Sequence, residues 1–126
     1  MRTCIAFATA VLAAAVAATG AAASVDPSIS VKPRKLTLGE TATIRGTSWV
    51  VGAGCSNRVV VRIRIAGATA RVGSDRVDPS TGAIRLRFTP PQSKFPTGRA
   101  RLIARQGCPD DQGGDLVRRT GLRLVD

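Results

Sequence analysis

Histidine and tyrosine are both missing from this chain of 126 residues, and its other aromatic residues are three Phe and one Trp. Without histidine, the chain cannot build a metal site with imidazole ligands or use imidazole as an acid or base. So few aromatic rings also exclude a platform on which nucleic-acid bases stack. Acidic residues are scarce as well, because 8 Asp and Glu stand against 19 Lys and Arg, for a net charge of +11. The composition therefore points away from imidazole chemistry and towards a protein with a cationic surface.

Residues 1–23 have the pattern of an export signal that a signal peptidase removes. After a positive start, residues 5–18 form an apolar run that only Thr9 interrupts. A helix that crosses a bilayer needs about 20 apolar residues, and this run is shorter. We therefore expect cleavage before Ser24. The alternative is an uncleaved membrane anchor. We therefore predict a protein that is secreted or held in the cell envelope. It has a single domain, residues 24–126, and no membrane span after cleavage.

Two cysteines, Cys55 and Cys108, remain once the signal has left with Cys4. In an oxidising compartment two cysteines most simply form one disulfide within the chain, although free thiols or bridges between molecules are alternatives. Such a bridge would close a loop of about 53 residues and stabilise the fold by about 4 kcal/mol, because it restricts the unfolded chain. A metal site is not expected, since two thiolates without histidine make an incomplete ligand set.

Apolar and polar residues alternate along most of the mature chain, with the period of two that is typical of strands with one buried face. The alternating runs cover residues 28–32, 41–45, 58–65, 84–89, 99–105 and 122–125, and a ragged run covers 71–77. Turn residues such as Gly39, Gly67 and Gly98 separate the runs. The mature chain has no segment with the sustained spacing of three and four that marks a helix. Six or seven short strands in about one hundred residues predict an antiparallel β-sandwich.

Residues 30–49, SVKPRKLTLGETATIRGTSW, resemble the opening of secreted bacterial immunoglobulin-like domains, many of them from actinobacteria with GC-rich genomes. The turn and strand at 78–88, with Gly82 in the turn, and the segment 96–102, PTGRARL, resemble later parts of the same domains. The likeness covers most of residues 27–125 and consists mainly of turn chemistry and alternation. It implies an all-β fold, a single immunoglobulin-like β-sandwich of about seven strands, and a secreted protein. It implies no chemistry, because such sandwiches host unrelated functions.

The sequence departs from this family at two points. Relatives often carry Tyr where Ala100 stands, so a tyrosine that ties down a loop is absent. In addition, Cys55 follows the second strand of the family order and Cys108 ends the sixth. The resemblance therefore implies a bridge between two end loops, not one that crosses the core.

No catalytic constellation is present in the sequence, so we expect neither an enzyme nor a cofactor. Residues 108–115, CPDDQGGD, could supply oxygen ligands to Ca²⁺. We favour a solvated loop whose acids balance nearby arginines, because the spacing matches no defined calcium loop. Trp49 could mark a ligand pocket, but a lone Trp after the second strand more often caps one end of a core.

Arginines occupy the outward positions of two runs, 58–65 and 99–105, that we expect to lie side by side in one sheet. With the last strand beside them, they would form one field: Arg58, Arg62, Arg64, Arg99, Arg101, Arg105 and Arg123. Like charges on adjacent strands destabilise a sheet by up to about 1 kcal/mol per pair, so a protein that tolerates them can be using them. The planar fork of arginine binds phosphate or carboxylate through two hydrogen bonds.

Three hypotheses about function follow. The first is a secreted interaction module whose arginines bind an anionic envelope polymer, lipid headgroups or an acidic protein. The second is a structural or accessory envelope protein whose charge is incidental, since a GC-rich genome encodes much arginine and a charged face keeps β-proteins soluble. The third is a carrier of a small ligand in a cleft of the sandwich. Intracellular nucleic acid is not an expected partner, because of the signal and the few aromatic residues.

Overall fold

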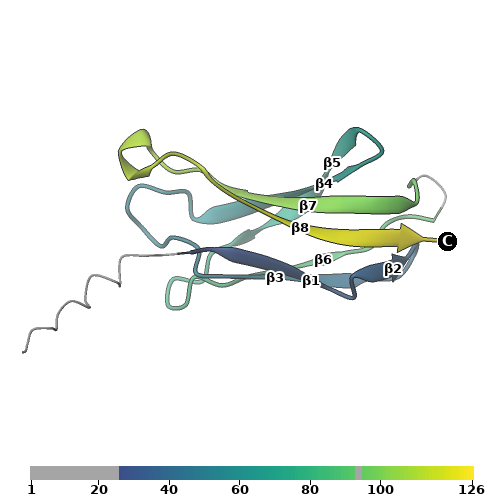
Figure 1. The fold of residues 1–126 in the computed structure, drawn as a ribbon. Helices are drawn as coiled ribbons and strands as arrows, with labels where there is room; N and C mark the ends of the chain where they lie inside the picture. The colour runs from purple at the N-terminus through teal and green to yellow at the C-terminus, as the bar shows by residue number, and fades with distance from the viewer. Residues whose placement is uncertain (1–25, 93–94) are drawn as a thin grey trace, which may run out of the picture.

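The computed structural model describes residues 26–92 and 95–126, so the predicted signal lies outside the described residues. Two β-sheets pack face to face over one core (Figure 1). A short 3₁₀ turn, η2 (Asp110–Gln112), lies between the last two of eight strands. The strands are β1 (Ser28–Lys32), β2 (Lys35–Thr37), β3 (Ala42–Thr47), β4 (Arg58–Ile65), β5 (Ala68–Arg76), β6 (Ile84–Phe88), β7 (Gly98–Gln106) and β8 (Leu116–Val125). Within the described ranges, no helix has the length and apolar character to cross a bilayer.

The strand order defines the type of sandwich. Strands β1, β3 and β6 form a three-stranded sheet, and a five-stranded sheet has the order β2, β8, β7, β4, β5. Neighbouring strands run antiparallel, except that β2 pairs with β8 in parallel. The immunoglobulin-like arrangement has β4, β7 and β8 adjacent in one sheet and β3 and β6 in the other. The predicted all-β immunoglobulin-like sandwich is therefore confirmed, with eight strands in place of about seven.

The core follows the period of two that the sequence shows. On β4 the four inward residues, Val59, Val61, Ile63 and Ile65, are all buried, while the residues between them point outward. The inward residues of β7 and β8 meet them in the same core, where Leu102 is fully buried. Burying a side chain of this size stabilises a fold by about 1.5–3 kcal/mol, so the alternating pattern is sufficient to select which face of each strand turns inward.

Trp49 is part of this core and lies two residues after the end of β3. It is 2% exposed, and its indole Nε1 donates a hydrogen bond of 3.2 Å to the carbonyl oxygen of Ser28. The backbone of Gly82 passes close by, and a Cβ on that glycine would lie 2.7 Å from the Trp49 carbonyl oxygen. Gly82 also has a φ of +76°, which favours glycine. The preferred interpretation of Trp49 as a residue at the end of the core agrees with this packing.

The ragged run at 71–77 covers the second half of β5 and the residue after it, and a bulge in this strand changes the direction in which residues point. Arg71 pairs with Arg62 and Gly73 pairs with Val61, so one additional residue, Val72, lies between them. Val72 packs against the core and Val77 is buried, although five positions separate them. A bulge inserts one residue into one strand of a pair, which shifts the alternation by one position. Val72 and Val77 therefore both face the core, although an odd number of positions separates them.

Two features of the five-stranded sheet differ from the prediction. Strand β2 has only three residues, too few to show a period. Strand β8 begins at Leu116, well before the predicted 122–125. Its inward side includes Arg118, whose Nε donates a hydrogen bond of 2.9 Å to the carbonyl oxygen of Pro27 and whose guanidinium lies 3.2 Å from the Asp26 carboxylate. These polar partners lie before β1, far from β8 in the sequence, so local alternation could not reveal the strand.

Candidate anion-binding face

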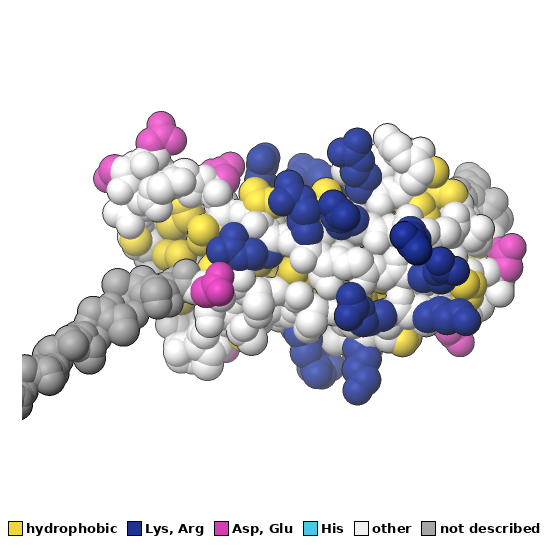
Figure 2. Space-filling view, in the orientation of Figure 1, with side chains coloured by type: hydrophobic (Ala, Val, Ile, Leu, Met, Phe, Trp, Pro, Cys, Tyr) yellow, Lys and Arg dark blue, Asp and Glu magenta, His cyan; other side chains and the backbone are white. Residues whose placement is uncertain are grey.

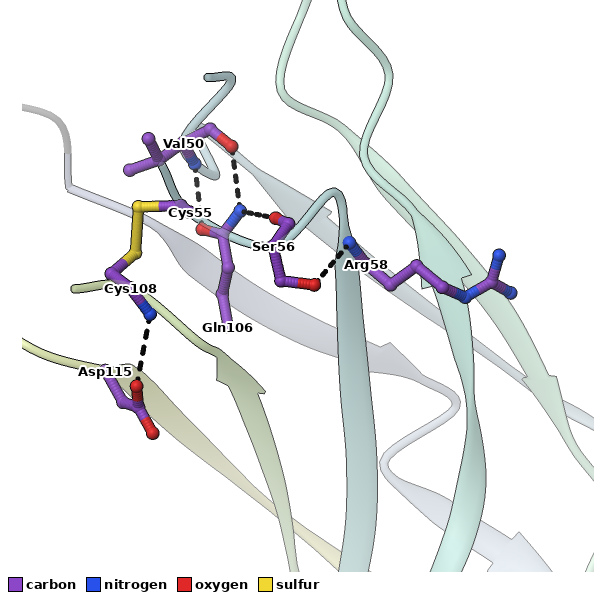
Figure 3. The surroundings of a disulfide bond; sticks show 7 residues. All are labelled: Val50, Cys55, Ser56, Arg58, Gln106, Cys108 and Asp115. Carbon is purple, nitrogen blue, oxygen red and sulfur yellow. Dashed lines mark hydrogen bonds between the residues drawn. A yellow bond between two sulfur atoms is a disulfide. The ribbon is translucent and has the colours of Figure 1, made fainter. Parts of the chain in front are cut away.

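The two cysteines form one disulfide that joins two loops at the same end of the sandwich (Figure 3). Cys55 lies between β3 and β4, and Cys108 lies between β7 and β8. The predicted pairing is confirmed, and so is the expectation that the bridge joins end loops and does not cross the core. A disulfide is consistent with an oxidising compartment outside the cytoplasm.

Gln106, the last residue of β7, holds the loop between β3 and β4 from inside. Its side chain is fully buried, and its Nε2 donates hydrogen bonds of 2.7 Å to the carbonyl oxygens of Val50 and Ser56. Its Oε1 accepts a hydrogen bond of 3.0 Å from the Val50 N–H (Figure 3). These bonds satisfy three loop backbone groups, which would be costly to bury without partners. The sequence carried a signal for this role, because Gln106 occupies an inward position of the alternating strand.

The acidic loop 108–115 is held by only one of its three carboxylates. Asp115 Oδ1 accepts a hydrogen bond of 3.1 Å from the Cys108 N–H, and its Oδ2 lies 3.8 Å from Arg105 Nε. Asp110 and Asp111 are exposed in η2. This agrees with a solvated loop that balances a nearby arginine. Within residues 26–92 and 95–126, no three His, Cys, Asp or Glu side chains gather as a metal site requires.

The structure brings the seven predicted arginines onto one face. Strand β4 lies between β7 and β5, and β8 lies on the other side of β7. Arg64 is directly opposite Arg101 across β4 and β7, and Arg99 is directly opposite Arg123 across β7 and β8. All seven side chains are exposed on the outer side of the five-stranded sheet. The predicted adjacency of the two arginine-bearing runs is therefore correct.

Four further cations share this face. Arg71 and Arg76 lie on β5 opposite Arg62 and Arg58, Arg119 lies on β8 opposite Ile103, and Lys35 lies on β2 beside Arg123. The sequence did not predict these four. Strand β5 has a bulge, β8 has Arg118 at an inward position where an apolar residue is expected, and β2 is very short. We call the whole set the arginine face: Lys35, Arg58, Arg62, Arg64, Arg71, Arg76, Arg99, Arg101, Arg105, Arg119 and Arg123.

Acidic residues do not neutralise the arginine face. In the part of the chain that the structure describes, its one ion pair joins Arg105 to Asp115, and both side chains are about half exposed, at 57% and 45%. The remaining acids occupy turns, strand ends, the segment before β1 and the C-terminal end: Asp26, Glu40, Asp75, Asp78, Asp110, Asp111 and Asp126. Figure 2 shows the same division, with dark blue side chains along the middle of the molecule and magenta ones towards its two ends. Positive charge thus covers the strands, and negative charge covers the loops.

The outer side of the three-stranded sheet is less cationic and rich in hydroxyl groups. It carries Lys32, Arg45, Arg85 and Arg87, and Arg45 lies directly opposite Arg85. Hydroxyl pairs lie among them, with 2.7 Å between the side-chain oxygens of Ser28 and Thr47. Both faces of the sandwich are therefore positive, but the denser array lies on the five-stranded sheet.

A carrier of a small ligand would need a cleft between the sheets. In the described residues, the side chains of the core fill this space. A mainly apolar hollow of about 260 Å³ lies instead at the disulfide end, where Val51, Val77 and Pro79 line it. Val51 is a large hydrophobic residue that is 50% exposed. This hollow lies mainly in the loops and shares only Arg76 with the arginine face.

No model of a known protein family and no curated protein sequence matches this chain, but several solved structures resemble it. The alkylpurine DNA glycosylase AlkC of Pseudomonas fluorescens, bound to DNA with an abasic-site analogue, has 17% identity and a TM-score of 0.51 over 86% of this chain. The likeness covers 33% of the glycosylase, so this chain spans about a third of its length. A CARDB domain from Pyrococcus furiosus, in complex with di-metal ions, has 18% identity and a TM-score of 0.42, over 79% of this chain and 93% of that domain. The glycosylase likeness concerns the fold alone.

Proposed function

We propose that this protein is an exported, non-enzymatic binding module whose arginine face holds an anionic polymer of the cell envelope. The single observation that carries the proposal is the set of like charges placed directly opposite one another on neighbouring strands, with a single ion pair to relieve them among the described residues. An anionic polymer supplies the missing counter-charge along the whole face.

Sheet geometry suits a polymer better than a single small ion. Outward residues on one strand repeat at about 6.6–6.8 Å, and neighbouring strands lie about 4.7–4.9 Å apart. Cations on five adjacent strands therefore form a two-dimensional array, in which several charged groups of one extended polymer can each find a guanidinium. Binding of this kind is strongly sensitive to salt, because exposed charges are screened over about 10 Å at 0.1 M ionic strength.

The experiment is a pull-down of the purified protein with its own cell-envelope fraction over a series of salt concentrations. The test variant replaces four face residues with serine: Arg62, Arg64, Arg99 and Arg101. The control variant removes the same charge from the three-stranded sheet by replacing Lys32, Arg45, Arg85 and Arg87 with serine. We expect binding that falls steeply with salt, is lost in the test variant and persists in the control.

Other outcomes support other functions. If both variants lose binding equally, net charge alone attracts the envelope and the charge is incidental to any specific site. If the wild type and both variants bind alike without salt sensitivity, the loops or edges carry the interaction and the proposal is wrong. The control is necessary because the second face is also cationic.

A further inference from the structure

One part of the arginine face is shaped as a hollow of about 360 Å³. Four arginines surround it from three strands: Arg64 on β4, Arg99 and Arg101 on β7, and Arg119 on β8. Its lining is completed by Ile65, Ala66, Ala100 and Ile103. We call it the arginine hollow.

The strand position beside Arg101 carries no side chain. Gly121 is the residue of β8 directly opposite Arg101, between Arg119 and Arg123 on the outward side of that strand. A Cβ at Gly121 would meet only one atom within 4 Å, a backbone oxygen at 3.8 Å, so no side chain fills the space above it. In the described part of the chain, none of the four arginines pairs with a carboxylate. The guanidinium groups around the hollow therefore keep their donors available.

We propose that the arginine hollow is a binding site for a phosphate group. This inference rests on the proposed function and deepens it, because it names the charged group of the polymer and the residues that hold it. A carboxylate presents two coplanar oxygens, which one guanidinium fork satisfies. A phosphate presents oxygens in tetrahedral directions and carries more charge, so it can accept hydrogen bonds from several forks that approach from different sides. Donors on three strands around one hollow fit the second geometry.

Arg64 and Arg101 are the central pair of this site. They lie directly opposite each other on β4 and β7, where like charges destabilise the empty sheet. A phosphate between them turns this repulsion into two charge-assisted contacts. Along the strand direction, Arg99 lies on one side of this pair and Arg119 lies on the other. These two arginines hold the remaining oxygens of the phosphate.

The test uses pyrophosphate and citrate as probes of similar charge at neutral pH, one with phosphate oxygens and one with carboxylates. Calorimetry measures their binding to the wild type, to an Arg64→Gln, Arg101→Gln variant and to an Arg58→Gln, Arg76→Gln control. The control pair is also directly opposed on the same sheet and removes the same charge, but it lies outside the hollow. A further arm compares delipidated envelope polymer with vesicles of phosphatidylglycerol, which separates a phosphate on a polymer from one on a lipid headgroup.

We expect pyrophosphate to bind more tightly than citrate and the Arg64, Arg101 variant to lose at least about tenfold in affinity, the loss of one charge-assisted contact or more. The Arg58, Arg76 control should stay within about threefold of the wild type. Equal losses in both variants, or equal binding of citrate, would overturn the phosphate site and leave the broader face intact. Conversely, pyrophosphate binding in the hollow without binding to either envelope arm would support the site and refute the proposed function.

Discussion

Salt should stabilise this protein, because its arginine face places like charges directly opposite one another on neighbouring strands. Five neighbouring pairs are directly opposed: Lys35–Arg123, Arg123–Arg99, Arg101–Arg64, Arg62–Arg71 and Arg58–Arg76. Two unit charges about 7 Å apart in water repel by about 0.6 kcal/mol, which gives about 3 kcal/mol for the set. The Debye length falls from about 30 Å at 0.01 M salt to about 3 Å at 1 M, so most of this repulsion is removed at high salt. We expect the free energy of unfolding to rise by about 2 kcal/mol between these conditions.

Urea denaturation measures this change, since urea is uncharged and leaves the ionic strength fixed. The buried Trp49 provides the fluorescence signal, and the disulfide is kept intact. A triple variant, Arg58→Gln, Arg64→Gln and Arg99→Gln, removes one partner from three of the five pairs, so its gain with salt should be less than half that of the wild type. A free energy of unfolding that stays flat or falls with salt would refute the reasoning. An equal gain in the variant would show that salt acts on something other than the arginine face.

Three further predictions concern the loops. Replacing Cys55 and Cys108 with serine should lower the free energy of unfolding by about 4 kcal/mol in the same assay, because the bridge spans a sequence separation of 53; a loss below about 1 kcal/mol would contradict this. Gln106→Leu should cost about 3 kcal/mol and speed hydrogen exchange in the loop after β3, because three backbone groups lose their partner. Unchanged exchange there would refute that role. The pKa of Asp78 is lowered, mainly by the hydrogen bond from the Ser80 hydroxyl. The ionised carboxylate therefore stabilises the fold above its unfolded pKa, and this contribution is lost as the pH falls through the folded pKa. Ser80→Ala should raise the pKa of Asp78 towards its ordinary value in an NMR titration, and an unchanged value would contradict the assignment.

Much of the candidate site could be predicted because its main strands are regular. In a regular strand the side chains alternate between the two faces with a period of two residues. On β4 and β7 the inward apolar residues fix the core face, so every arginine between them must point outward. The family order then places these two strands next to each other. Arg71 and Arg76 escaped this reasoning, because the bulge at Val72 shifts the parity of β5. Arg119 escaped it because Arg118 occupies an inward position where a polar residue is not expected.

The sequence by itself determined the strands with clear alternation, the outward direction of their arginines and the choice of cysteines for the bridge. These properties depend on local period and composition, and burial of apolar side chains enforces them wherever the strand lies. Only the tertiary structure decided which arginines oppose one another, how Gln106 holds the loop between β3 and β4, and that four arginines from three strands surround one hollow. Register between strands distant in sequence sets these contacts, and it arises from the packing of both sheets over one core.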